Sequence, residues 1–353
     1  MKVYIKDLKT DAAGVLEPKK TIAEIFKNLG LKNLKGKRVF VKPNILRAAN
    51  PDEAVITNPI LIAETVSFLL DSGAIVTVGD NPAPDRRRNE TEIAKLSGIH
   101  QASHGRFKNI GRYSQKIKRP NNLLKEIYVS REIMDCDILV SLPKFKTHPL
   151  NTMSIALKNQ LGIVPGGLKP SIHAFFPNLD DFCKVLLEIY QIRPPDVIIV
   201  DCLNVIDGRG KKFAPGKIIA GNNGYAVDYV CAMMAGINPD KIPLLKIAKK
   251  IGLYNPVDIE IVGELEKLKN YSPPVAFPFR NSLIELGAMI SYKLLMNRVP
   301  VIDSTLCTKC LSCENVCPKR AVKNEKIDYN KCINCYCCIE VCPQKAIRTK
   351  LWL

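Results

Sequence analysis

Short apolar runs rich in β-branched residues alternate along most of the chain with segments whose apolar residues recur at helical spacing. Predicted strands cover residues 37–44, 74–81, 136–144 and 196–202, and predicted helices cover residues 58–73, 151–162, 178–192 and 224–236. Strands that are nearly continuous apolar runs and alternate with helices are typical of a parallel sheet covered on both faces. The pattern therefore predicts an α/β fold over residues 1–265, with a mostly parallel sheet and helices on both faces.

Local signals fix the ends of one helix and the extent of a connector. Asn58 suits the cap of the helix over 58–73, Pro59 its first position and Gly73 its end. We expect a connector over residues 266–300 and a separate small domain over 301–353. Residues 282–296 have helical spacing but are too short to span a bilayer. They suit a helix packed on its own domain, or one that binds a membrane surface or a partner.

The cysteines are concentrated in the predicted small domain. Nine of the 13 cysteines lie between Cys307 and Cys342, and the others are scattered through apolar segments. The N-terminal residues contain no apolar core of a signal peptide, so we expect a cytoplasmic protein without a transmembrane segment. An odd number of cysteines, distributed in this way, favours a metal site in a reducing compartment over a disulfide framework.

The cysteine-rich segment is a repeat of two copies. "CTKCLSCENVCP" and "CINCYCCIEVCP" share the spacing C-x2-C-x2-C-x3-C-P. In this spacing three thiolates bind one [4Fe-4S] cluster and the fourth reaches the other cluster. The predicted ligand sets are Cys307, Cys310, Cys313 and Cys342 for one cluster, and Cys332, Cys335, Cys338 and Cys317 for the other. Zinc ribbons use paired cysteines and do not fit. Cys337 lies outside the pattern, as a packed neighbour or a substitute ligand.

Residues 301–353 resemble the bacterial two-cluster [4Fe-4S] ferredoxins, with all ligand cysteines and both following prolines in place. The resemblance implies a small α+β domain that carries two [4Fe-4S] clusters, transfers single electrons and meets a redox partner protein. Four basic residues around the cysteines either steer an acidic partner or are ordinary solvated surface. They are Lys309, Lys319, Arg320 and Lys331.

Polar residues follow the predicted strands at the sheet edge where ligands of open α/β folds collect. They are Lys42, Asn44, Asp80, Lys144, Lys146, His148, Asp201 and Asn204. Lys158 and Asn159 then interrupt an apolar helix, and a glycine-rich loop leads to His173. Lysines, helix N-termini and loop amides suit a phosphate or carboxylate. A cationic surface loop is the competing interpretation. The loop is not a P-loop, because Leu168 occupies the position of the lysine.

The segments "VKPNI", "PKFKTH", "ALKNQLG", "SIH" and "AGNNGYAVDYVCAMMAG" resemble the DUF362 domain, which is often fused to a C-terminal dicluster ferredoxin segment. The resemblance covers residues 1–265 and implies no activity. It does place a set of candidate residues in the family's recurrent motifs. They are Lys42, Lys144, Lys146, His148, Lys158, Asn159, His173 and Asp228.

The formal charge of +18 allows a nucleic acid, an anionic surface, an acidic partner or an anionic small molecule. The basic residues are dispersed, without a nucleic-acid module, which disfavours nucleic acid. The leading hypothesis is an oxidoreductase that passes electrons from two clusters to an anionic ligand or cofactor, with His148 or His173 supplying a proton. One alternative is a ferredoxin-like electron carrier whose large domain docks a partner protein. Another is a scaffold with structural clusters. The sequence leaves an additional cofactor, such as a flavin, open.

Overall fold

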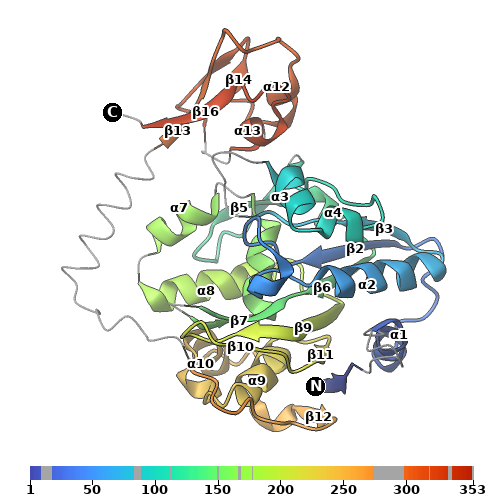
Figure 1. Ribbon diagram of the computed structural model, residues 1–353. Helices are drawn as coiled ribbons and strands as arrows, with labels where there is room; N and C mark the ends of the chain where they lie inside the picture. Colours follow the sequence, from blue (N-terminus) through green and yellow to red (C-terminus); the bar gives the residue numbers. More distant parts are fainter. Residues whose placement is uncertain are drawn as a thin grey trace.

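The computed structural model has a large α/β unit and a small C-terminal unit (Figure 1). It describes residues 1–8, 18–82, 89–111, 113–148, 151–165, 168–176, 178–273, 298–317, 319–332 and 336–351. The large unit is built on one sheet, whose main path runs β12-β1-β11-β9-β6-β2-β3. These strands are β12 (Glu260–Val262), β1 (Lys2–Asp7), β11 (Lys217–Gly221), β9 (Val197–Ile206), β6 (Ile138–Leu142), β2 (Arg38–Pro43) and β3 (Ile75–Val78).

The centre of the sheet is parallel. Strand β2 pairs in parallel with β3 and β6, and β9 pairs in parallel with β6 and with β7 (Lys144–His148). Antiparallel pairs join β9 to β11 and to β10 (Lys212–Phe213), β11 to β1, and β7 to β8 (Thr152–Ser154). The carboxyl ends of the central strands therefore meet at one edge, where the polar residues that follow them gather.

The strand pleat divides the core into two layers, because neighbouring residues of a strand point to opposite faces. Phe40 and Leu139 belong to one cluster, and Val41 and Val140 belong to the other. The first cluster is completed by α8 (Leu179–Tyr190), α9 (Gly224–Met234) and α10 (Pro243–Lys250), and the second by α1 (Pro18–Asn28), α2 (Pro59–Asp71), α3 (Glu90–Leu96) and α4 (Ile99–Ala102). The predicted α/β class, with helices on both faces, is confirmed.

The boundary signals of α2 act as the sequence predicts. The Asn58 side chain accepts a hydrogen bond from the Ile60 amide, and Gly73 has a φ of 76° just after the helix. A left-handed residue of this kind favours glycine because a side chain would be strained there. Strands β1 and β11 lie outside the predicted strands, as does the separate antiparallel hairpin of β4 (Ser114–Lys118) and β5 (Glu126–Ser130).

The prediction of one helix over 151–162 is wrong. Residues Thr152–Ser154 form β8, and the helical part is α6 (Ala156–Asn159) followed by a 3-10 turn over Gln160–Ile163. Ser154 pairs with Lys146 in the β7–β8 ladder, and Thr152 has a φ of 62°, which no α-helix accommodates. Strand pairing therefore overrides the local helical preference until Ala156.

The described residues of the small unit form two short antiparallel pairs and two short helices. β13 (Arg298–Ile302) pairs with β16 (Ile347–Leu351), and β14 (Val322–Lys323) pairs with β15 (Lys326–Ile327). Helices α12 (Ser312–Val316) and α13 (Cys337–Val341) contact each other. The predicted helix over 282–296 lies outside the described residues. None of the helices that the structure describes is long and apolar enough to cross a membrane.

The chain stays on the large unit beyond residue 265. Tyr271 is buried, with its ring centroid 5.9 Å from that of Phe145 and 5.6 Å from that of Phe213. The Ser272 amide donates to Asp207 Oδ2 over 3.2 Å. The first residues of the predicted connector are therefore anchored to the sheet.

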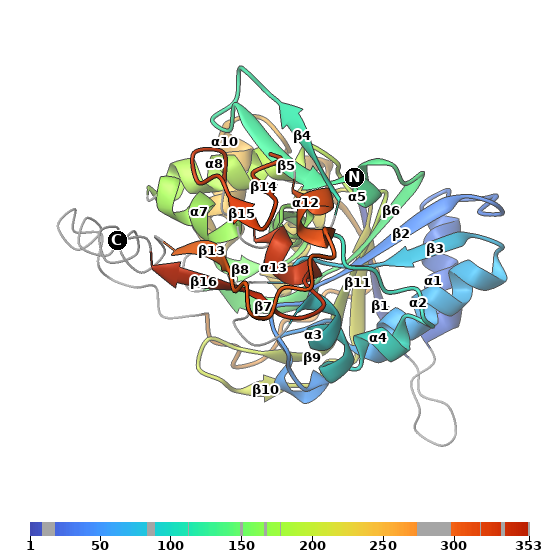
Figure 2. The ribbon, with the colours of Figure 1, turned by 90° about the horizontal axis from the view of Figure 1, so that it is seen from above.

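Two basic side chains join the small unit to the large one. Lys345 Nζ lies 2.8 Å from Glu92 Oε1 in α3, and Lys319 Nζ lies 4.0 Å from Glu126 Oε1 in β5 and 5.6 Å from the centre of the Tyr128 ring. Figure 1 shows the small unit above α3 and β5, and Figure 2 looks down on it from above. Because both pairs are at least partly exposed to solvent, we expect the contact to weaken with salt.

Candidate functional site

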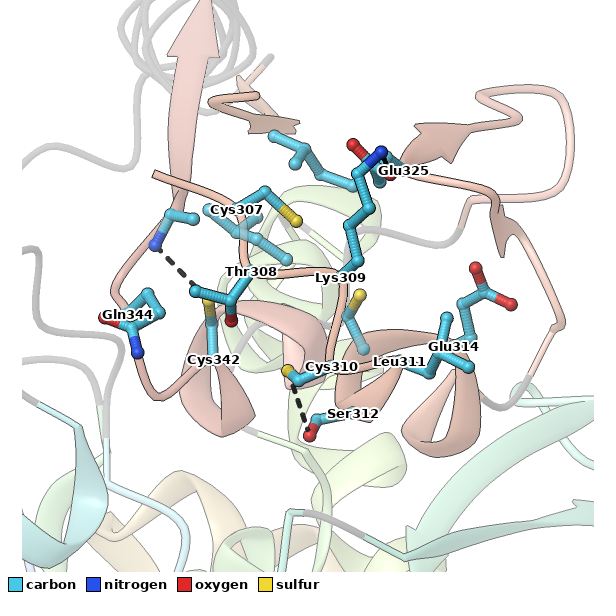
Figure 3. A pocket seen from close by; sticks show the side chains of 14 residues that line it. Cys307, Thr308, Lys309, Cys310, Leu311, Ser312, Glu314, Glu325, Cys342 and Gln344 are labelled. Carbon is cyan, nitrogen blue, oxygen red and sulfur yellow. Dashed lines mark hydrogen bonds and ion pairs between the residues drawn. The ribbon is translucent and has the colours of Figure 1, made fainter. Parts of the chain in front are cut away.

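The cysteines of the small unit surround two pockets. Cys307, Cys310, Cys313 and Cys342 line one pocket (Figure 3). Cys317, Cys332, Cys337 and Cys338 line the other, and Cys335 lies outside the described residues. Thiolates are the ligands of [4Fe-4S] clusters, so the residues around each pocket fit such a group. Cys342 thus lines the pocket of the first repeat and Cys317 lines that of the second, and Cys337 is buried beside the second pocket. The ligand sets themselves stay a prediction.

The two halves of the repeat have matching local geometry. The Ala321 amide donates to Cys317 Sγ over 3.1 Å, and the Ala346 amide donates to Cys342 Sγ over 3.2 Å. Leu311 and Tyr336, which precede the two short helices, both have a φ of 59°. Hydrogen bonds to cluster sulfurs are one means of setting a reduction potential. Each fourth cysteine thus has an equivalent environment.

The crossed ligand sets can be tested by counting iron in single and double variants after anaerobic reconstitution. Cys342→Ser is expected to remove the cluster of the first set and half of the iron. Adding Cys310→Ser should then remove no more iron, because both cysteines serve the same cluster. Combining Cys310→Ser with Cys317→Ser should remove all of it. The opposite outcome for the two double variants would show that the ligand sets are not crossed.

A buried ion pair lies where β2 and β3 end. Lys42 is fully buried, and its Nζ donates to Asp80 Oδ1 over 2.7 Å and to Asn159 Oδ1 over 3.3 Å. Asp80 Oδ2 accepts the Ile45 amide over 2.8 Å. Burial lowers the pKa of Lys42, and the neighbouring Asp80 carboxylate opposes that shift. The pair ties β2, β3 and α6 together at the edge of the sheet.

A second buried ion pair joins β7 to β9. Lys144 Nζ donates to Asp201 Oδ2 over 2.9 Å and to Asn204 Oδ1 over 2.5 Å. Asp201 also accepts the Asn58 amide, at 2.6 Å, and the Leu203 amide, at 3.0 Å. Both Lys42 and Lys144 are therefore neutralised by a carboxylate of the fold.

Lys146 differs from these two lysines. Its Nζ donates to Asn44 Oδ1 over 2.5 Å and to the Val55 carbonyl over 3.2 Å, and its exposed fraction is 8%. Burial lowers the pKa of Lys146 to about 7, and the neighbouring charges of Lys144, Lys42 and Lys169 lower it further while Asp80 raises it. No described carboxylate is paired with Lys146, so its cationic form is the one that an anion would stabilise.

Lys158 and His148 form a contact on the same edge. Lys158 Nζ is within hydrogen-bond reach of His148 Nε2, and the Asn151 amide donates to His148 Nδ1 over 3.2 Å. Both side chains are partly exposed. Burial holds the pKa of Lys158 well below its usual value, with a further lowering by Lys146 and an opposing effect of Cys183. His173 lies on α7 (Leu168–Phe175), and its side chain is outside the described part of the structure.

The Asp228 side chain binds backbone amides, and none of its described hydrogen bonds is to a candidate lysine. Its Oδ1 accepts the Ala156 amide over 2.7 Å, and its Oδ2 accepts the Leu157 amide over 3.3 Å. Burial raises the pKa of Asp228 to about 7, and the two amides oppose that shift. The carboxyl group holds the start of α6, and it thereby positions Lys158 and Asn159, which α6 carries.

The structure adds residues that the pattern of the sequence does not single out. Asn81 Nδ2 donates to the Gly162 carbonyl over 3.1 Å, and Lys169 Nζ contacts the Asn81 carbonyl. A Cβ on Gly162 would lie 2.0 Å from Asp80 Oδ1 and 2.3 Å from Lys42 Nζ. Gly162 and Lys169 lie close to Lys158 and Asn159 in the sequence, but only the fold shows that Gly162 packs against the ion pair and that Lys169 contacts Asn81, the residue after Asp80.

Comparisons with known proteins identify both parts of the chain. The family described as "Domain of unknown function (DUF362)" matches residues 39–233, and a "4Fe-4S dicluster domain" matches residues 299–343. The thylakoid-associated protein sll1697 of Synechocystis sp. (strain ATCC 27184 / PCC 6803 / Kazusa) is 29% identical over 263 residues, which cover 72% of this chain and 80% of that protein. Both resemblances predicted from the sequence are confirmed.

Among solved structures, the lactate racemase apoprotein from Thermoanaerobacterium thermosaccharolyticum aligns with a TM-score of 0.43 and 14% identity. The alignment covers 66% of this chain and 62% of the racemase chain.

Proposed function

Because the chain belongs to the DUF362 family and carries a 4Fe-4S dicluster domain, we propose that it is an iron–sulfur oxidoreductase that delivers electrons to an anionic ligand bound by its α/β unit. The iron–sulfur domain itself supports a role in electron transfer. The observation that carries the finer proposal is the presence of two lysines, Lys146 and Lys158, without a described carboxylate partner at the ligand edge of the sheet. A redox partner protein would supply the electrons.

The lysines divide into two kinds. Lys42 and Lys144 are paired with Asp80 and Asp201, so they build the edge and add no net charge to it. Lys146 has only neutral oxygen partners among the described residues. A carboxylate or phosphate placed against Lys146 would pair with its ammonium in a poorly solvated environment, where such a pair is stronger than in water.

Two loops of the small unit contact the large unit. When bound, [4Fe-4S] clusters supply one-electron transfer. Lys319 and Lys345 follow Cys317 and Cys342 closely in the chain, and they contact β5 and α3 of the large unit. Asp80, which holds Lys42, lies between β3 and α3 in the chain. These contacts support the proposal that the small unit transfers electrons to a ligand bound at the sheet edge that carries Lys42 and Lys146.

Anion binding is expected to be coupled to uptake of a proton by Lys146. The pKa of Lys146 is about 7, so a bound anion would raise it, and the site must take up a proton at pH 8. Affinity should therefore fall as the pH rises above 7, where free Lys146 is neutral. Asp80, Lys42, Lys144 and Lys169 are the charged groups that act on it, and the Lys158 amine is a further titratable neighbour. Calorimetry with phosphate or pyruvate, in two buffers of different ionisation enthalpy, measures how many protons the protein takes up when the anion binds.

Matched variants make this test specific. Lys146→Met should abolish the thermal stabilisation by the anion, whereas Lys246→Met, at an exposed position, should leave it unchanged. A bound anion should also speed reoxidation of the dithionite-reduced holoprotein if it is an electron acceptor. If no anion stabilises the protein and Lys146→Met still transfers electrons to a partner normally, the carrier hypothesis replaces this one.

A further inference from the structure

The hydrogen bonds of His148 define its tautomer. The backbone amide of Asn151 can only donate, and it donates to His148 Nδ1 over 3.2 Å. A ring nitrogen that accepts a hydrogen bond carries no proton, so the proton of the neutral imidazole is on Nε2. His148 therefore presents an N–H donor on the side of its ring that meets Lys158.

This tautomer constrains the state of Lys158. His148 Nε2 and Lys158 Nζ are in hydrogen-bond contact, and an ammonium group has three donors and no acceptor. Two donors cannot satisfy each other, whereas a neutral amine accepts the Nε2 hydrogen with its lone pair. The lowered pKa of Lys158, caused by burial and by the charge of Lys146, agrees with this assignment. Lys158 is only partly buried as a residue, and reaction with a ligand requires that the ligand reach its amine from the exposed side.

We propose that Lys158 is a nucleophile that forms an imine with the carbonyl group of a small anionic carbonyl compound, such as a 2-oxo acid. A neutral, partly desolvated lysine is the form that attacks carbonyl carbon. The proposal rests on the ligand site proposed above, because Lys146 would bind the carboxylate of the same molecule. It narrows the ligand from any anion to one that also bears an aldehyde or ketone.

The step balances without an oxidant or a reductant. The Nζ lone pair adds to the carbonyl carbon, and a C–N bond forms. The carbonyl oxygen takes the Nε2 hydrogen of His148 and one amine hydrogen, and it leaves as water. The second amine hydrogen restores the proton of His148, and a C=N bond replaces the C=O bond. His148 thus has two roles, since it keeps the amine neutral before attack and donates to the departing oxygen.

Reductive trapping tests the imine directly. The holoprotein is incubated at pH 7 with pyruvate and cyanoborohydride, and the site of the adduct is mapped by peptide mass spectrometry. We expect one adduct, on Lys158, whereas exposed lysines with pKa values near about 10.4 should label only at higher pH. Lys158→Arg should remove the adduct, and Lys246→Arg should not. Because mapping of the wild-type protein locates the adduct, the test does not depend on the folding of any variant. Labelling spread over exposed lysines at pH 7 would overturn the proposal.

Two substitutions of His148 separate its role from simple packing. His148→Gln keeps an N–H donor, so labelling at pH 7 should persist. His148→Glu places a carboxylate beside Lys158, which should keep the amine protonated and move the pH profile of labelling to higher pH. The other groups that act on the pKa of Lys158, Lys146 and Cys183, are the same in this variant and in the wild type. An unchanged profile in His148→Glu would contradict the proposal. If pyruvate stabilises the protein without an adduct, the imine is wrong while the anion site stands. If it neither binds nor labels and phosphate also fails to bind, both proposals fall.

Discussion

Replacing Asp201 by Asn is expected to lower the free energy of unfolding by about 3–5 kcal/mol, the cost of removing one partner of a buried ion pair. Both side chains of the Lys144–Asp201 pair are fully buried. The substitution leaves the buried Lys144 ammonium without its carboxylate partner, with only neutral oxygens such as that of Asn204 to accept from it. It also places an amide where Asp201 now accepts the backbone N–H groups of Asn58 and Leu203. Chemical denaturation of the isolated variant and the wild-type protein measures the difference.

The matched control for Asp201→Asn is the same substitution in an exposed ion pair. Asp71 Oδ2 lies 2.6 Å from Lys19 Nζ, and the two side chains are 65% and 47% exposed. Solvent screens such a pair, so Asp71→Asn should leave the denaturation midpoint close to that of the wild type. If the two variants unfold at the same denaturant concentration, the Lys144–Asp201 pair does not stabilise the contact between β7 and β9.

The sequence predicts the layers of the fold well because burial imposes a pattern on each strand and helix. The helix after Asn58 is found with its predicted cap, since that cap depends on residues next to one another in the chain. The helix over 151–162 fails for the opposite reason. Whether Thr152–Ser154 forms a strand depends on β7, its partner across the ladder, and no local signal reports that partner.

In the candidate site, too, the sequence predicts features that depend on neighbouring residues in the chain, and it misses those that depend on contacts between distant segments. Rules for the carboxyl ends of strands select Lys42, Lys144 and Lys146 as candidates, and the structure places Lys42 in β2 and the other two in β7. These rules cannot show that two of these lysines are neutralised while Lys146 lacks a described carboxylate partner, because the carboxylates come from other strands. The roles of Asp228 and Gly162 are likewise set by contacts across the fold.

Replacing Gly162 by Ala is expected to destabilise the protein by about 3 kcal/mol or more, because it disrupts the buried Lys42–Asp80 pair. A Cβ at this position would lie 2.0 Å from Asp80 Oδ1, 2.3 Å from Lys42 Nζ and 2.7 Å from Lys42 Cε. Real atoms do not approach this closely, so the ion pair must move apart or the 3-10 turn must shift. Either change also displaces Asn159, which Lys42 contacts, and should weaken anion binding. Denaturation and calorimetry on the same variant measure both effects.

A control variant separates destabilisation by the clash at Gly162 from the general destabilisation that follows when a glycine is replaced. Gly105 has a φ of 72°, and no atom lies within 4 Å of a Cβ built on it. Gly105→Ala should therefore cost only the left-handed backbone strain, roughly 1–2 kcal/mol, and leave anion binding intact. If the clash with the ion pair is the cause, Gly162→Ala should cost less when Lys42 and Asp80 are both already Ala, since both clashing side chains are then absent and the effects of neighbouring sites do not add. Equal costs in both backgrounds would mean that Gly162 serves the turn rather than the ion pair.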